Sequence, residues 1–183
     1  MSDILSKMTA ALLAVLLLFA YPALQTAQRQ EDIHYLAAYQ AMVQFADAVR
    51  SKGYVSPVMY EEFIRQLEVG GGIHEVELEH RRKKYHPEYG DPANPNTFLN
   101  DFSVVYDAYY SPEILSVLFP EDKGGLPKER GPYKLQTGDY FSVTLTDHSR
   151  GPMDIFSDFL YGGPAPEISG LMTYGGMVLN EDY

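Results

Sequence analysis

The chain has 183 residues, with 25 acidic and 14 basic side chains and a formal net charge of −11. This length suits one domain with an appendage, and the negative charge argues against nucleic acid as a partner because no basic excess is available to neutralise phosphates. The absence of cysteine from the sequence excludes disulfides, thiolate metal sites and cysteine nucleophiles.

The first predicted element is an apolar helix over residues 8–24, a run of 17 residues without a charged side chain. At about 1.5 Å per residue such a helix covers roughly 25 Å, and residues 4–7 extend it to roughly the thickness of a bilayer's hydrocarbon core. Because a helix of this length that is apolar on all sides is rarely a core helix, the run predicts a membrane anchor. The anchor residues are Ala10, Ala11, Leu12, Leu13, Ala14, Val15, Leu16, Leu17, Leu18 and Pro22.

A cleaved signal peptide is the alternative to a retained anchor. Cleavage needs small residues of the Ala-x-Ala kind, and a cut after Ala23 would place Tyr21 where a small residue is required. We therefore expect an anchor that is uncleaved or processed near the N-terminus. Lys7 and the amino terminus outweigh Asp3 on one flank, whereas the other flank is acidic. The positive-inside tendency then predicts a single-pass protein of the cell membrane, with its N-terminus in the cytoplasm and its C-terminal domain outside.

An amphipathic helix is predicted directly after the anchor, over residues 25–52, and no residue between the two segments breaks a helix. Pro22 is expected to kink this long rod, and Gly53 is expected to end it. Its apolar stripe packs either on the chain's own globular domain or on neighbouring copies in an assembly. The stripe consists of Tyr35, Tyr39, Met42, Ala46 and Val49.

The middle of the chain alternates predicted helices, strands and loops. Ser56 and Pro57 form an N-cap and first turn that open a helix over residues 57–70. Alternating Glu and aliphatic residues predict a half-buried strand over 73–86, and a proline-rich loop follows. A helical region is then expected over 97–119, with an interruption at Ser111-Pro112.

The C-terminal third is rich in predicted strands. A tight turn is expected around Gly138-Asp139, and a strand follows it to residue 147. A short helix over 153–163 and one or two strands within 168–183 complete the prediction. The fold class is therefore α+β, a small antiparallel sheet with packed helices. The expected units are an anchor (1–24), an amphipathic helix (25–52) and an extracytoplasmic head domain (53–183).

The layout and several short motifs resemble one family. An apolar N-terminus that continues into an amphipathic helix, with an α/β head behind it, is similar to the type IV and tight-adherence minor pilins, in particular to small membrane-anchored proteins of Gram-positive bacteria. Pilins carry a Glu near the start of the apolar segment, whereas here only Asp3 is present, so the resemblance implies a minor or accessory subunit. The motifs that carry it are residues 19–25, 53–56, 60–63, 133–143 and 174–178.

The sequence offers little for catalysis or metal binding. His74 and His80 would lie roughly 20 Å apart on a strand at about 3.3 Å per residue, too far apart to share one ion. Ser149 follows His148, but a catalytic triad is defined by geometry and not by adjacency. The carboxylate pairs, such as Asp154 with Asp158, are expected to be solvated. We therefore expect no enzyme activity, no metal and no cofactor.

A basic run, Arg81, Arg82, Lys83 and Lys84, is unusual in so acidic a chain. It is either the solvated end of a strand or a contact for an anionic surface such as lipid headgroups or wall polymers. The main functional hypothesis is a non-enzymatic, pilin-like minor subunit or accessory component of a pilus or a secretion or conjugation assembly. Its expected partners are membrane lipid and other subunits, and nucleic acid is not expected. The alternative is a membrane-tethered extracytoplasmic binding module for a wall polymer or another ligand.

Overall fold

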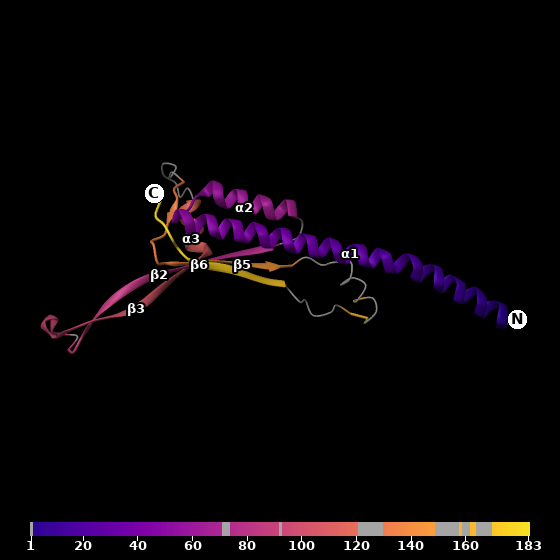
Figure 1. Ribbon diagram of the computed structural model, residues 1–183, viewed down its shortest axis with the longest axis horizontal. Coiled ribbons are helices and arrows are strands. Elements are labelled where there is room, and N and C mark those ends of the chain that lie inside the picture. Colours follow the sequence, from indigo (N-terminus) through magenta and orange to yellow (C-terminus); the bar gives the residue numbers. More distant parts are fainter. Residues whose placement is uncertain are drawn as a thin grey trace.

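The longest element, α1, runs from Ser2 to Lys52 and passes through Pro22 without interruption. Its C-terminal part lies over the sheet, while its N-terminal part extends beyond the rest of the protein (Figure 1). This N-terminal part, which includes residues 8–24, is called the free part of α1 below. Gly53 ends the helix with a φ of +75°, and its N–H donates a hydrogen bond of 2.8 Å to the carbonyl of Val49. A left-handed backbone at this position favours glycine, so the predicted end of the helix is confirmed.

The computed structural model describes residues 2–70, 74–91, 93–120, 130–148, 158, 162–163 and 170–183. Among these residues, no helix has both the length and the hydropathy that spanning a membrane requires. The transmembrane part of the predicted fold class is therefore without support from the structure and stays a prediction.

Four antiparallel strands form the main sheet, in the order β3-β2-β5-β6. They comprise β2 (His74–Tyr89), β3 (Phe98–Tyr110), β5 (Tyr140–Asp147) and β6 (Gly170–Met177). A smaller antiparallel pair joins β1 (Tyr54–Val55) to β4 (Tyr133–Lys134). The predicted α+β class with a small antiparallel sheet is confirmed, and the last segment contributes the single strand β6.

The helix α2 (Pro57–Gly70) begins where it was predicted, and the hydroxyl of Ser56 accepts a hydrogen bond of 3.2 Å from the backbone N–H of Met59. It packs beside α1, where the rings of Phe45 and Phe63 stack with centroids 4.4 Å apart. Alternating residues of β5 point from the sheet into the same core. The largest fully buried side chains are Phe63, Phe141, Met42, Leu78, Ile114, Leu118, Leu135, Leu145, Val49, Val55, Val143 and Val178.

The helix predicted over residues 97–110 is wrong, because this segment is mostly the strand β3. Its valines and aromatic residues have β propensity, and pairing along β2 fixes them in extended form. The predicted interruption at Ser111 is confirmed, since α3 (Ser111–Leu118) starts there. The hydroxyl of Ser111 accepts a hydrogen bond of 2.7 Å from the N–H of Leu78, so the start of α3 is fixed to β2.

Strands β2 and β3 continue past the rest of the sheet as a two-stranded arm. The arm ends in a turn that contains the short 3₁₀ helix η1 (Pro95–Thr97), so the predicted loop over 87–97 is shorter than expected. Figure 1 shows the arm slanting away from the helices, at the end of the molecule opposite to the free N-terminal part of α1. The short helix predicted over 153–163 falls almost wholly outside the described residues.

Candidate functional site

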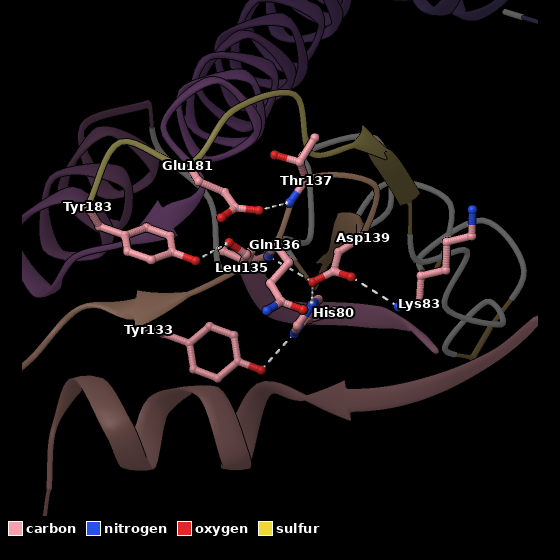
Figure 2. A network of polar contacts seen from close by, with 9 residues as sticks. All are labelled: His80, Lys83, Tyr133, Leu135, Gln136, Thr137, Asp139, Glu181 and Tyr183. Carbon is pink, nitrogen blue, oxygen red and sulfur yellow. Dashed lines mark hydrogen bonds and ion pairs between the residues drawn. The ribbon is translucent and has the colours of Figure 1, made fainter. Parts of the chain in front are cut away.

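A buried polar network joins β2 to the turn before β5 (Figure 2). His80 and Asp139 are each only 2% exposed. The imidazole Nε2 of His80 lies 2.9 Å from Oδ2 of Asp139, and its Nδ1 lies 2.7 Å from the hydroxyl of Tyr133. Both ring nitrogens of His80 therefore have a partner, as a buried polar group requires.

The carboxylate of Asp139 also fixes the backbone around it. Its Oδ1 accepts a hydrogen bond of 3.0 Å from the N–H of Lys83, and its Oδ2 accepts one of 2.9 Å from the N–H of Gln136. The N–H of Asp139 itself donates to the carbonyl of Gln136 at 3.0 Å, and Gly138 has a φ of +93°. The tight turn predicted here is confirmed, and one side chain holds it against β2.

The protonation states follow from burial. Loss of solvent lowers the pKa of His80 below its usual 6.5, although the hydrogen bond to Asp139 acts in the opposite direction. Burial, with nearby Tyr109 and Glu113, raises the pKa of Tyr133 to about 12. At neutral pH the hydroxyl of Tyr133 donates to Nδ1 of a neutral His80, whose Nε2–H donates to the Asp139 carboxylate.

An open pocket of about 690 Å³ lies over this network. The C-terminal segment reaches the pocket, where the hydroxyl of Tyr183 donates to the carbonyl of Leu135 at 3.2 Å. Thr137 is tied to the same segment through its N–H and Glu181 at 2.7 Å (Figure 2). The pocket lining also includes Arg82, whose side chain makes no hydrogen bond or ion pair with any residue that the structure describes.

The network suits a structural role, holding the turn before β5 against β2, and it lacks the chemistry of a nucleophilic triad. A tyrosine with a pKa near 12 is a poor nucleophile at neutral pH, and the imidazole of His80 has no free nitrogen with which to accept a proton. No group of His, Asp or Glu side chains among the described residues could hold a metal ion. The pocket offers a ligand tyrosine surface, the cations of Arg82 and Lys134 and the carboxylates of Glu113 and Asp139.

The predicted anchor residues all lie on the free part of α1. Leu12 is 69% exposed, and Leu13, Val15 and Leu18 are similarly uncovered. The helix continues through Leu16, Leu17 and Pro22, and the side chains of these two leucines are outside the described set. The side chains of residues 10–15, Leu18 and Pro22 are all exposed, and no part of the chain that the structure describes covers them.

The predicted packing stripe divides at the point where α1 reaches the head. Met42, Ala46 and Val49 are fully buried in the chain's own core. Tyr39 is only partly covered and meets the ring of Tyr174 edge-on at 6.5 Å, and Tyr35 is half exposed. The C-terminal half of the stripe therefore packs on the chain's own domain. Its N-terminal end, at Tyr35 and Tyr39, is available to another molecule.

The four basic residues do not form one surface, because they lie within β2 and alternate between its faces. Arg81 binds Glu79 through two hydrogen bonds of 2.8 and 3.0 Å, and Lys83 lies over the ring of Tyr85. On the other face, Lys84 pairs with Asp107, and Arg82 borders the pocket. The run lies within β2, which continues to Tyr89, and the side chains of Arg81 and Lys84 are exposed, so contact with an anionic surface stays a prediction.

Sequence patterns did not identify the buried network. Its members are 53 and 59 residues apart in the chain, so no local spacing connects them. An Asp beside a turn glycine is a common turn pattern and does not indicate burial. Comparison of the chain with protein-family models, curated proteins and solved structures finds no match.

Proposed function

We propose that this chain is a non-enzymatic, pilin-like minor subunit or accessory component of a cell-surface pilus or a secretion or conjugation assembly. The observation that carries the proposal is the division of α1. One face of its C-terminal part is buried in the head, whereas the run 8–24 in its N-terminal part is uncharged and helical, and no described residue covers its described side chains. An element of this kind supports a function that depends on an apolar partner outside the chain.

The free part of α1 has too much apolar surface to remain in water. Burial of such surface contributes roughly 25 cal/mol per Å², and monomeric soluble proteins rarely expose apolar patches above a few hundred Å². The uncharged run 8–24 lies within this part of α1. Membrane lipid is the partner that its sequence fits best, with neighbouring subunits beside it. Under this proposal the N-terminus is cytoplasmic and the head and arm are outside.

Cysteine crosslinking in membranes tests the assembly, because the natural chain has no cysteine. Tyr35→Cys introduces a thiol at the exposed N-terminal end of the stripe, and Met42→Cys introduces one in the buried part. We expect intermolecular disulfides for Tyr35→Cys and none for Met42→Cys, which is the matched control. Monomers for both variants, together with extraction of the chain from membranes by alkaline carbonate, would contradict the proposal.

A tethered binding module is a second candidate, favoured by the open pocket over His80. Arg82 and Lys134 on its lining would suit an anionic polymer, and Tyr109, Tyr133 and Tyr183 would add contact area. A glycerol-phosphate oligomer is a suitable probe for binding to the full chain in detergent. Saturable binding that Arg82→Gln weakens about tenfold or more would support this function. Equal binding by both chains, or none, would argue against it.

A further inference from the structure

The outer face of the sheet, on the side away from α1, has an ordered charge pattern. Leu78 and His80 of β2 point into the core, so the odd-numbered residues of this strand point outward. Along β2, from its start at His74 toward the arm, the outward side chains are first acidic and then basic. In chain order they are Glu75, Glu77, Glu79, Arg81 and Lys83.

Two charges of this row, Glu77 and Lys83, have no charged partner among the described residues, whereas Glu75 at the end of the row lies 3.2 Å from the imidazole of His148. Glu79 and Arg81, in the middle, neutralise each other. Glu77 on one side and Lys83 on the other make no ion pair with any residue that the structure describes, although Lys83 contacts the ring of Tyr85. The face therefore carries an unpaired negative and an unpaired positive charge at equal distances from a neutral centre.

Around the Glu79–Arg81 pair, this face presents uncovered tyrosine and methionine side chains. Tyr110 of β3 lies opposite Glu79, and Tyr140 of β5 lies opposite Arg81. Met177 of β6 continues the row beside Tyr140. All three side chains are exposed, with Tyr110 at 56% and Met177 at 57%. Tyrosine and methionine are enriched at protein interfaces, and an apolar centre with charged flanks is the usual anatomy of one.

We propose that a second copy of this chain packs on this outer face, related by a two-fold axis that passes near the level of His80 on β2. The axis places Glu77 of each copy opposite Lys83 of the other, so the dimer contains two Glu77–Lys83 ion pairs. Self-complementarity of this kind is what an isologous dimer requires. The tyrosines and Met177 then form the centre of the interface.

The dimensions are compatible with this arrangement. Glu77 and Lys83 are separated by roughly 20 Å along the strand at about 3.3 Å per residue, with the axis midway. Two packed sheets lie about 10 Å apart with their strands nearly aligned, a gap that an extended Lys and Glu span together. The arm slants away from the helices, toward the side on which the second copy would lie (Figure 1).

Charge complementarity favours a second copy over other occupants. A polyanion such as a wall polymer would meet the carboxylates of Glu75 and Glu77. A basic protein surface would meet Arg81 and Lys83. A partner must therefore have the same two signs in the opposite order, and this face itself has them. This interface is separate from the free part of α1, so it goes beyond the proposed function and can fail independently of it.

The test is a charge-swap experiment with two differently tagged forms of the full chain in detergent micelles. Glu77→Lys and Lys83→Glu should each weaken self-capture about tenfold or more, because each homodimer then opposes like charges twice. When the two variants are mixed, both contacts become attractive again, so capture of one variant by the other should return to within a few fold of the wild type.

The matched control is Glu68→Lys, which makes the same charge change on the exposed surface of α2 and should leave capture unchanged. Far-UV circular dichroism establishes that all variants are folded. Two results would overturn the proposal: capture by the single variants at the wild-type level, or a mixture no better than either variant alone. If copies associate only through α1, the single variants will be captured at the wild-type level. That result would overturn the proposed interface and would not contradict the proposed function.

Discussion

Oδ2 of Asp139 lies 2.9 Å from Nε2 of His80, and this contact joins two parts of the chain that are 59 residues apart. The same carboxylate holds the backbone amides of Lys83 and Gln136. One buried side chain therefore fixes the base of the arm, the turn before β5 and the floor of the pocket. The stability of this region should depend on it more than on any exposed ion pair.

Asp139→Ala should destabilise the protein by about 3 kcal/mol, because it leaves buried donors on His80 and two amides without an acceptor. Thermal unfolding of the full chain in detergent, followed by far-UV circular dichroism, measures the loss. The control is Asp101→Ala, at an exposed position on β3, which should change stability by less than about 0.5 kcal/mol. Equal stability of the two variants would contradict the assigned role of Asp139.

Protein stability should fall as the pH drops through 6.5, in part because of His80. Burial lowers the pKa of His80 in the folded state below 6.5, so below this pH the unfolded chain binds a proton that the folded chain excludes. The stabilisation is fully present above pH 6.5. The melting temperature of His80→Gln should therefore depend less on pH between 7.5 and about 5.5 than that of the wild type. His86→Gln, on the arm, should retain the wild-type slope.

Tyr133 gives the opposite prediction at alkaline pH. Because the folded protein raises its pKa from 10.0 to about 12, the unfolded chain releases this proton first and stability decreases as the pH rises above 10. Tyr133→Phe should remove part of this decrease, and at neutral pH it should cost about 1 kcal/mol for the hydrogen bond to His80. Tyr85→Phe, at an exposed position, should behave like the wild type.

Among the glycines that the structure describes, Gly53 combines a left-handed backbone with the shortest distance from a built Cβ to another atom. A Cβ at this position would lie 2.2 Å from the carbonyl oxygen of Asn180, and the φ of +75° is strained for any other residue. We expect Gly53→Ala to destabilise the protein by about 2 to 4 kcal/mol, whereas Gly131→Ala, with nothing within 4 Å, should be nearly neutral. Equal melting temperatures for the two variants would contradict the close packing of the C-terminal segment on the end of α1.

Elements with a strong local pattern could be predicted from the sequence. Ser56-Pro57 correctly placed the start of α2, and alternation correctly placed β5 and most of β2. The strand β3 was missed because both faces of the arm are exposed, so most of its residues show no alternation, and partly buried and exposed positions alternate only over 107–110. Its valines and tyrosines were the available indication, and it is the pairing with β2 that decides its structure.

The candidate site could not be predicted for a different reason. His80 lies on the inward face of β2 beside Leu78, and the sequence alone does not show that a distant Asp and Tyr satisfy it. The basic run was conspicuous in sequence, but strand alternation places Arg81 and Arg82 on opposite faces. Local patterns predicted helices and turns, whereas the network depends on contacts between residues far apart in the chain.

The proposed function requires that an apolar partner covers the free part of α1 in the cell. The most direct measurement is the labelling of single cysteines by a membrane-impermeant maleimide in intact membranes and after denaturation. Leu12→Cys should be protected until denaturation, and Val69→Cys, on the exposed surface of α2, should react at once in membranes that expose the head. Equal labelling rates for the two cysteines in intact membranes would contradict the proposed function.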